Sequence, residues 1–345
     1  MSYLKNLKWE MIIYSLLSIL MGILMWKYCL KKTAQVVIVM ILISFFSFAI
    51  VYFAPGDISD MYVNPEMTEE QKANVIAQLG LDKSMTEQYF AWAKRAVHGD
   101  LGVSLSNKSA VWPQFMQRLP ATIILMGSSM ILSLLLAIPL GLWSGYKKNS
   151  WLDNLISSLA YMGMSIPSFW FGMLLIIVFA AVLKVLPSSG MHTVGNVSAF
   201  DTFQHMILPC ITLSIGHVAV YIRYIRANTI GQLSEEYVLT AEAKGDSQTK
   251  ILFRHVLKNT LLPIITLMGM NLASLVCGSF IVESVFGWPG IGTFAMSAIG
   301  SRDYPVIMAY VMLSGFLLVV GNFIADLLYA FVDPRIKRGG ASGGK

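Results

Sequence analysis

The fold class that this sequence predicts is an all-α integral membrane protein, because of its composition and the length of its apolar segments. Of 345 residues, 56% are hydrophobic and only 13% are charged, whereas a soluble domain carries about 25% charged residues. The mean hydropathy is +0.64. Six apolar segments also reach the length of about 20 residues that a bilayer-spanning helix needs. We therefore expect one helical membrane domain in place of several soluble domains.

The predicted core spans are separated by short polar or charged segments. They cover about 33–55, 121–146, 155–183, 206–227, 260–285 and 306–331. A further apolar run, Met11–Trp26, precedes them and is slightly short for a hydrocarbon core of about 30 Å. We expect it to form an extra N-terminal span, with a helix lying flat at the interface as the alternative. The expected organisation is an accessory segment at 1–32, a transmembrane domain at 33–338 and a flexible tail at 339–345.

The distribution of basic residues predicts the orientation. Loops on one side of the spans carry most of them: Lys147, Lys148, Lys244, Lys250, Arg254, Lys258, Arg335, Lys337 and Arg338. The short loops opposite, about 184–205 and 286–305, carry only Lys184 and Arg302. The positive-inside rule makes the basic side cytoplasmic. The net charge of +6 is then explained by membrane topology, and we expect no nucleic-acid partner.

The region at about 56–120 is expected outside the cell. It contains two candidate helices, Pro65–Leu79 and Thr86–His98, and the second has Tyr89, Trp92, Ala93 and Val97 along one stripe. This region could cap the helical bundle, or it could be a receiving surface for an external partner.

A polar loop at about 228–258 lies between apolar spans and is expected in the cytoplasm. Ser234 and the acids after it suit a helix start, and Gly245 suits a helix end. A second polar start follows at Asp246–Thr249, and a basic segment leads from there into the next apolar run. The pattern predicts two short helices that meet at a turn on the membrane surface, which is a shape suited to docking.

The sequence offers no convincing catalytic constellation. No HExxH motif occurs, and the five histidines are scattered. The tail at 339–345 matches GxxxxGK by letter, but no Ser or Thr and no helix can follow the lysine, as a phosphate-binding loop requires. Cys29, Cys210 and Cys277 have unrelated spacings and are expected to be buried apolar residues. We expect no enzyme, no metal site and no cofactor in this chain.

A few polar residues inside the spans are candidates for a transport pathway or its gate. Glu283 and Asp326 are the clearest, because a charge within a span is costly and is usually paired or functional. His217 and Asn271 are weaker candidates. For each, an interhelical hydrogen bond that fixes packing is the alternative.

The polar loop resembles the cytoplasmic loop of ABC importer permeases, the membrane subunits that separate ATP-binding subunits drive. The general pattern is E-A-A-x-x-x-G-x9-I-x-L-P, and this sequence departs from it at Leu239 and Lys258. These departures resemble the branch that imports peptides and nickel, with Y-V-x-T-A-R-A-K-G followed by R-H-x-L-x-N. The matching segments here are Tyr237–Gly245 and Arg254–Asn259, with Glu242 in place of the arginine. Further short blocks match in order from about Lys31 to Lys337, among them Ala54-Pro55-Gly56-Asp57, Ile166-Pro167-Ser168-Phe169-Trp170 and Pro289-Gly290-Ile291-Gly292.

The resemblance implies a first-permease (B-type) subunit of the type I ABC importer fold, in the bacterial cell membrane. It would form the pathway with a homologous second permease, receive cargo from an extracellular or periplasmic binding protein, and be driven by two ATP-binding subunits, which hold the ATP and Mg²⁺. The residues that it assigns to ATPase coupling are Tyr237, Thr240, Ala241, Glu242, Ala243, Lys244, Gly245, Arg254 and His255. The cargo would be an oligopeptide or dipeptide.

Two alternatives stay open from the sequence. Within the family, the cargo could be nickel or a metal chelate, although the 21 methionines are scattered along lipid-scale runs where packing explains them. Outside it, an ATP-independent secondary transporter would predict inverted repeats or a dense polar midplane, and neither is evident.

Overall fold

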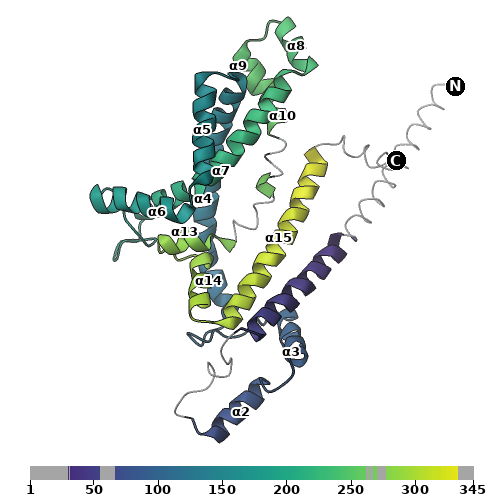
Figure 1. Cartoon of the computed structure of the whole chain (residues 1–345), viewed down its shortest axis with the longest axis vertical. Coiled ribbons are helices and arrows are strands. Elements are labelled where there is room, and N and C mark those ends of the chain that lie inside the picture. The colour runs from purple at the N-terminus through teal and green to yellow at the C-terminus, as the bar shows by residue number, and fades with distance from the viewer. Residues whose placement is uncertain are drawn as a thin grey trace, which may run out of the picture.

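The computed structural model describes Leu30 and residues 32–54, 67–261, 264, 267–269 and 277–332. Within this part of the chain all regular elements are helices, and they begin with an unlabelled helix at Lys32–Tyr52. The labelled elements are α2 (Glu69–Leu79), α3 (Met85–Val97), α4 (Val111–Tyr146), α5 (Trp151–Ser165), α6 (Ser168–Leu175), η2 (Ile176–Val182), α7 (Ala199–Leu233), α8 (Glu236–Ala243), α9 (Gln248–Lys250), η3 (Ile251–Val256), α10 (Leu257–Thr260), α13 (Phe280–Val285), α14 (Ile291–Gly300) and α15 (Tyr304–Val332). Figure 1 shows α8 and α9 at one end of the elongated molecule and α2 at the other.

Two long helices, α4 and α7, form the central pair. They have 36 and 35 residues, so each is over 50 Å long at about 1.5 Å per residue and exceeds a hydrocarbon core of about 30 Å. Their backbones approach closely at two glycines of α4. A Cβ added to Gly141 would lie 2.7 Å from Ile225, and one added to Gly145 would lie 2.6 Å from Thr229. Small residues therefore set this helix contact, as is common in membranes.

Four of the predicted spans, 33–55, 121–146, 206–227 and 306–331, each lie on one long helix in the described residues. Four helices are long and apolar enough to cross a membrane, and a bent pair raises this number to as many as five within the described residues. The fifth predicted span, 260–285, falls largely outside those residues. The run Met11–Trp26 and the tail at 339–345 lie wholly outside them. Helix α4 begins ten residues before the span predicted at 121–146, since Val111 is its first residue.

The third predicted span is not one straight helix, which corrects the expectation for 155–183. It consists of α5 and a second segment, Ser168–Val182, which are bent by 102° relative to each other. Pro167 has no amide hydrogen to continue a helix, and Ile166 before it is extended, with φ −83° and ψ 123°. The α6 segment consequently projects sideways from the bundle as an arm (Figure 1); here "the α6 arm" means α6 with η2.

Helix α3 follows the predicted helix at Thr86–His98 to within one residue, whereas α2 begins at Glu69 and not at the expected Pro65, because Thr68 is its N-cap. Each of the two helices has a complete capping box. Helix α3 packs against the first helix, Lys32–Tyr52: the hydroxyls of Tyr89 and Ser44 lie 2.9 Å apart, and Phe45 meets the Tyr89 ring edge-on. The predicted stripe holds only in part, because Val97 is 85% exposed. The contact supports the interpretation of this region as packed on the helical bundle.

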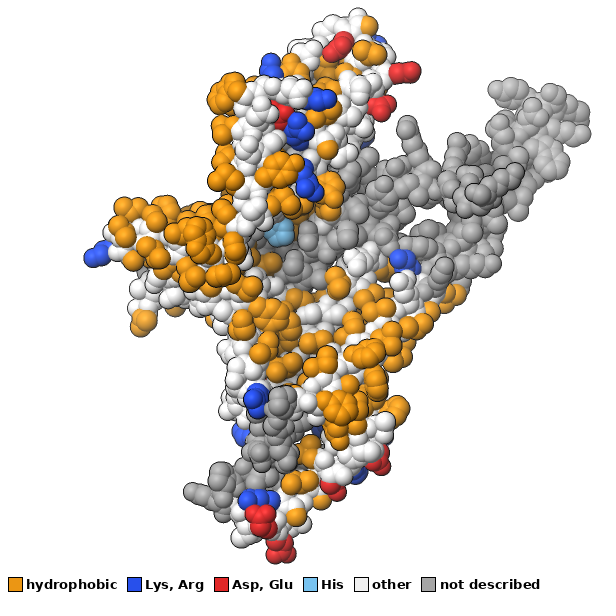
Figure 2. Space-filling view, in the orientation of Figure 1, with side chains coloured by type: hydrophobic (Ala, Val, Ile, Leu, Met, Phe, Trp, Pro, Cys, Tyr) orange, Lys and Arg blue, Asp and Glu red, His pale blue; other side chains and the backbone are white. Residues whose placement is uncertain are grey.

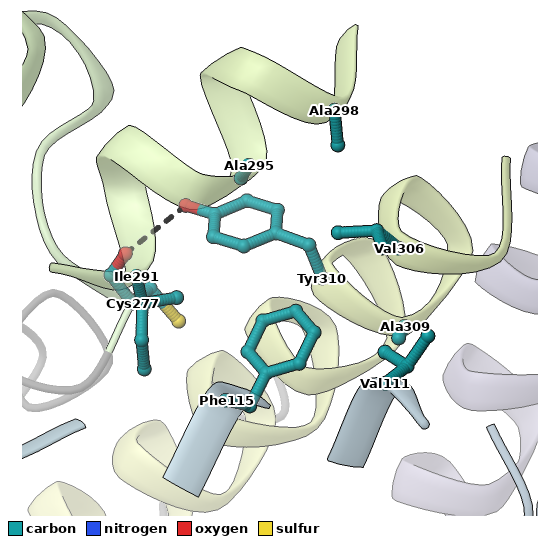
Figure 3. Close-up of a cluster of buried hydrophobic side chains, with 9 residues drawn as sticks. All are labelled: Val111, Phe115, Cys277, Ile291, Ala295, Ala298, Val306, Ala309 and Tyr310. Atoms are coloured by element: carbon teal, nitrogen blue, oxygen red, sulfur yellow. Dashed lines mark hydrogen bonds between the residues drawn. The ribbon is translucent and has the colours of Figure 1, made fainter. Parts of the chain in front are cut away.

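One core cluster joins the start of α4 to α14 and α15. Figure 3 shows Phe115 and Tyr310 at its centre, and the Tyr310 hydroxyl donates a hydrogen bond to the Cys277 carbonyl at 3.3 Å. Tight packing there contrasts with the outer surface, where hydrophobic side chains cover the α6 arm and the middle of the face in Figure 2. Leu135 and Ile131 of α4 are 66% and 61% exposed. An apolar exterior of this kind suits a lipid environment.

Candidate functional site

The polar loop forms the two predicted short helices, and Gly245 makes the turn between them. Helix α8 ends in a Schellman motif: the Gly245 amide donates to the Glu242 carbonyl at 2.9 Å, and the Asp246 amide donates to the Ala241 carbonyl at 3.1 Å. Gly245 has φ +79°, a left-handed conformation that residues with a Cβ adopt at a cost. The turn therefore depends on glycine at this position.

The second arm of the loop begins at Ser247. Its hydroxyl accepts a hydrogen bond from the Lys250 amide at 3.4 Å and so caps α9, which continues into η3 and α10. Asp246 pairs with the Lys250 ammonium group, and the His255 Nε2 lies 3.4 Å from its other oxygen. These two groups, Lys250 above all, hold the pKa of Asp246 below its usual range. The charge cluster fixes the start of the second arm against its own helix.

The two arms of the loop are held together, and to the long helices, by a small apolar core. Its buried members are Val238, Ala241, Ile251, Leu252 and Val256. Tyr146, at the end of α4, and Leu233, at the end of α7, pack against this core. A force on the loop is thereby applied to the ends of both central helices.

The opposite face of the loop is open to solvent. Two large apolar side chains, Leu239 and Phe253, are 61% and 57% exposed there. Between the two arms lies a hollow of about 490 Å³, lined by Tyr237, Thr240, Ala241, Lys244, Asp246, Lys250, Arg254 and His255. A surface that combines exposed apolar side chains with a hollow rich in cations is suited to binding another protein.

The structure brings all nine predicted coupling residues into this one loop. Six of them line the hollow, and Glu242, Ala243 and Gly245 lie exposed on the same loop. Ala241 is 4% exposed and belongs to the apolar core of the loop, so its main contribution is to packing. The role of the nine residues in ATPase coupling stays a prediction.

Glu283 is fully buried beside a compact turn at 286–293. The Thr122 hydroxyl of α4 donates to its Oε1 at 3.2 Å, and the Thr293 amide donates to its Oε2 at 3.0 Å. A Cβ added at Gly278, Gly290 or Gly292 would lie closer than 3.0 Å to its side chain. The carboxylate thus fills a pocket that the chain shapes with glycines, and it ties the turn to α4.

The other three pathway candidates are less completely placed. His217 is partly buried in α7 and stacks on Tyr221, with ring centroids 6.0 Å apart. Asp326 lies in the last turns of α15, and Asn271 falls outside the described residues. The role of all four residues in a pathway stays a prediction.

A buried ion pair at the loop end of the bundle was not predicted from the sequence. Asp153, 1% exposed in the first turn of α5, accepts hydrogen bonds from Arg226 of α7: Nε at 2.6 Å and Nη2 at 2.7 Å. The Ser144 hydroxyl of α4 and the Asn149 amide donate to the same carboxylate at 2.5 and 2.8 Å. From sequence, Asp153 is an ordinary first-turn acid and Arg226 an interfacial cation, and 73 positions separate them.

A second missed carboxylate fixes the outer loop that precedes α4. Asp303, 2% exposed at the start of α15, accepts hydrogen bonds from the Ser104 hydroxyl at 2.5 Å and from the Leu105 and Ser106 amides at 3.1 and 3.2 Å. The sequence could not reveal this contact, because 199 positions separate Ser104 from Asp303.

Two family models match the chain. One, described as "Binding-protein-dependent transport system inner membrane component", matches residues 137–338, and its N-terminal counterpart matches residues 25–126. The chain is 39% identical over 312 residues to the oligopeptide transport system permease protein AppB of Bacillus subtilis, covering 90% of this chain and 99% of that protein. It is 33% identical over 336 residues to the dipeptide transport system permease protein DppB of Escherichia coli K12, covering 91% and 99%.

A further relative is the glutathione transport system permease protein GsiC of Escherichia coli O6:H1, which is 36% identical over 313 residues and covers 91% of this chain and 99% of that protein. Among solved structures, an inward-facing MetNI methionine ABC transporter matches with a TM-score of 0.50 at 16% identity, covering 64% of this chain and 96% of that chain. The latter likeness supports the fold, and it agrees with the expected type I permease architecture.

The resemblance expected from the polar loop is confirmed over nearly the whole chain. The protein is a multi-pass membrane protein and a transport subunit, not an enzyme, and proteins of this kind work with ATP-binding subunits and a second permease. The chain belongs to the family of inner-membrane permeases of binding-protein-dependent ABC importers.

Proposed function

We propose that this permease imports oligopeptides or dipeptides. The observation that carries the proposal is whole-length similarity, at 33–39% identity, to proteins named as oligopeptide and dipeptide permeases. A binding protein outside the cell delivers the cargo, and a homologous second permease completes the pathway. Two ATP-binding subunits supply the energy and hold the ATP and Mg²⁺.

The polar loop is the element that couples ATP binding to transport in this proposal. Its exposed Leu239 and Phe253 and the cationic hollow between its arms provide the contact surface for an ATP-binding subunit. Its apolar core packs on the ends of α4 and α7, so the loop carries force into the central helices. Coupling requires that the ATPase in its two states binds the two permease conformations with different free energies. The loop contacts carry that difference.

Glu283, Asp326, His217 and Asn271 remain the candidates for the pathway or its gate. The contacts of Glu283 with Thr122 and Thr293 support a specific form of this role. We assign Glu283 the task of holding the turn at 286–293 in shape, so that the turn can act as a rigid wall of the pathway. Direct contact of this carboxylate with cargo is disfavoured because the side chain is fully buried.

The test is reconstitution of the complete complex in proteoliposomes with its binding protein. Uptake of radiolabelled dialanine and trialanine, dependent on both ATP and the binding protein, is the expected result. Uptake of ⁶³Ni²⁺ without peptide uptake would contradict a peptide cargo and indicate that the cargo is a metal. Uptake that persists with a hydrolysis-deficient ATPase would contradict an ATP-driven mechanism and favour a secondary transporter.

A further inference from the structure

We propose that the Asp153–Arg226 ion pair is a positioning element that transmits movement of the polar loop from α7 to α5 and the α6 arm. The inference rests on the proposed function of the loop as the site of ATPase coupling. It concerns a different part of the molecule, however, because neither residue belongs to the loop or is expected to touch the ATPase.

The position of the pair places it directly behind the loop. Arg226 lies seven residues, or about two helical turns, before Leu233, the α7 residue that packs on the loop core. Asp153 lies in the first turn of α5 and seven residues after Tyr146, the α4 residue that packs on the same core. Ser144 adds α4 to the junction through its 2.5 Å hydrogen bond to Asp153. Three helices are therefore fastened together within two turns of the loop.

Further from the loop, the contact between α5 and α7 includes small and apolar residues. Gly163 of α5 faces Ile215 and Ala219 of α7, and Ala160 of α5 is buried in the same core cluster as Ala219. A hollow of about 30 Å³ also lies between the two helices and is lined in part by Ser157, Ala160 and Ala219. Such surfaces allow one helix to slide along the other. The two-pronged pairing of Arg226 with Asp153 resists sliding because both of its hydrogen bonds have a fixed direction.

Burial makes this junction hard to open during a transport cycle. Asp153 is 1% exposed, so separating it from Arg226 would leave an uncompensated charge away from water. Arg226 is 28% exposed in its side chain and can reach water if its partner is lost. Removing the Asp153 carboxylate is therefore expected to destabilise the protein less than removing the Arg226 guanidinium.

The ion pair is thus expected to couple movement of the polar loop to movement of the α6 arm. Movement of the loop displaces α7, the ion pair passes that displacement to the start of α5, and the 102° bend turns it into movement of the α6 arm. Without the pair, the ATPase can still bind the loop and hydrolyse ATP, but the arm no longer follows. The predicted defect is thus loss of coupling between hydrolysis and transport, which differs from a general loss of the complex.

The experiment compares four variants in the reconstituted complex: Asp153→Asn, Arg226→Gln, the double variant and Arg223→Gln. Arg223→Gln is the matched control, since it removes the same charge from an exposed site on the same helix. Trialanine uptake per ATP hydrolysed is expected to fall at least tenfold in Asp153→Asn and Arg226→Gln. The double variant should be no worse than Arg226→Gln alone, because both changes break one interaction. The control should stay within twofold of the unmodified complex.

A cargo-independent readout separates this proposal from the proposed function. Spin labels at Glu236→Cys and Ile177→Cys, both exposed, report the distance between α8 and the α6 arm. In the complex with the ion pair intact, this distance is expected to stay constant when a non-hydrolysable ATP analogue is added. In the Asp153→Asn complex, the distribution of distances should shift or broaden. If the unmodified complex transports nothing, the proposed function fails while the distance test still decides the role of the pair.

Two results would overturn the role of the ion pair. One is an Asp153→Asn complex whose uptake per ATP is unchanged, or whose uptake and hydrolysis fall in the same proportion. The other is a spin-label distance that responds to the ATP analogue equally with and without the pair. If Asp153→Asn does not assemble, Arg226→Lys decides, because it keeps the charge and removes the two-pronged hydrogen bonding. An unchanged uptake per ATP in that variant also contradicts the proposal.

Discussion

Gly245 offers the most direct test of the coupling loop, because substitutions there act through the backbone alone. Its φ of +79° lies in the left-handed region, and an added Cβ would meet no atom within 4 Å. A side chain at this position therefore costs conformational energy without a steric clash. The perturbation reports on the turn between α8 and α9, and the protein around it is left intact.

The expected magnitudes follow from the backbone geometry. A residue with a Cβ in the left-handed region costs about 1–2 kcal/mol, which lowers the population of the native turn about 5- to 30-fold relative to competing conformations. Gly245→Ala should show a loss of this size in transport rate. Gly245→Asn should lose less, because asparagine tolerates the left-handed region, and Gly245→Val should lose more, because its branched Cβ makes that region still less accessible. We expect the valine variant to abolish transport.

The assay is ATP-dependent uptake in proteoliposomes, with membrane insertion checked by protein yield and monodispersity in detergent. Gly231→Ala is the control: Gly231 lies at the end of α7, has no positive φ, and has no atom within 4 Å of an added Cβ. It should transport at the normal rate. If Gly245→Val transports normally, or if Ala, Asn and Val do not rank in the order given, the turn is not what couples the loop to transport.

Three further predictions concern the loop surface, its charge cluster and the buried carboxylate. Phe253→Ser should leave insertion unchanged, because the side chain is 57% exposed, but should reduce copurification of the ATP-binding subunits. Because the pKa of Asp246 is lowered in the folded loop, the charged carboxylate stabilises the loop fully above the unfolded pKa, and this stabilisation is lost only as the pH falls through the folded pKa. Uptake per ATP should therefore be constant from pH 8 to 5.5. The Asp246→Asn variant should have a lower uptake per ATP throughout that range. Glu283→Ala removes the acceptor of the buried Thr122 hydroxyl and of the partly buried Thr293 amide, and a buried donor left unsatisfied costs about 1–3 kcal/mol. The variant should therefore lower the melting temperature of the solubilised protein, whereas Ser297→Ala, at an exposed site on α14, should not.

The sequence predicted the helices well because hydropathy and capping are local properties. The starts of α2 and α3 are set by Thr68 and Ser84, whose side chains cap backbone amides three residues later, although the helices were expected to start at Pro65 and Thr86. The turn at Gly245 follows in the same way from residues next to it in the chain. The nine coupling candidates lie together in the structure for the same reason, since all of them occur within 19 consecutive positions, 237–255.

What the sequence did not predict depends on partners far apart in the chain. Pro167 was visible within an apolar run, but proline also occurs inside the straight helices α4 and α7, so its presence alone does not distinguish a 102° bend from a tolerated proline. The Asp153–Arg226 pair joins residues 73 positions apart. Glu283 reaches Thr122 across 161 positions. In each case, composition and periodicity carry no information about which helix will lie alongside.

The long helix α7 links these distant features into one mechanical path. Its last residue, Leu233, packs on the loop core, and Leu208, 25 residues earlier and about 38 Å away at 1.5 Å per residue, packs on Val282 and Phe286. Phe286 in turn lies against Gly172 of the α6 arm, where an added Cβ would be 3.1 Å from its ring. The arm is therefore connected to α7 at its base, through Phe286 and through Thr212 of α7 beside Gly172, and again through the start of α5. A rigid rod alone would move both connections equally. The connection through α5 is a directional ion pair, whereas the contact with Phe286 is apolar and allows sliding. We therefore expect the arm to follow the loop through α5 and to slide at Phe286, beside the turn that Glu283 holds in shape.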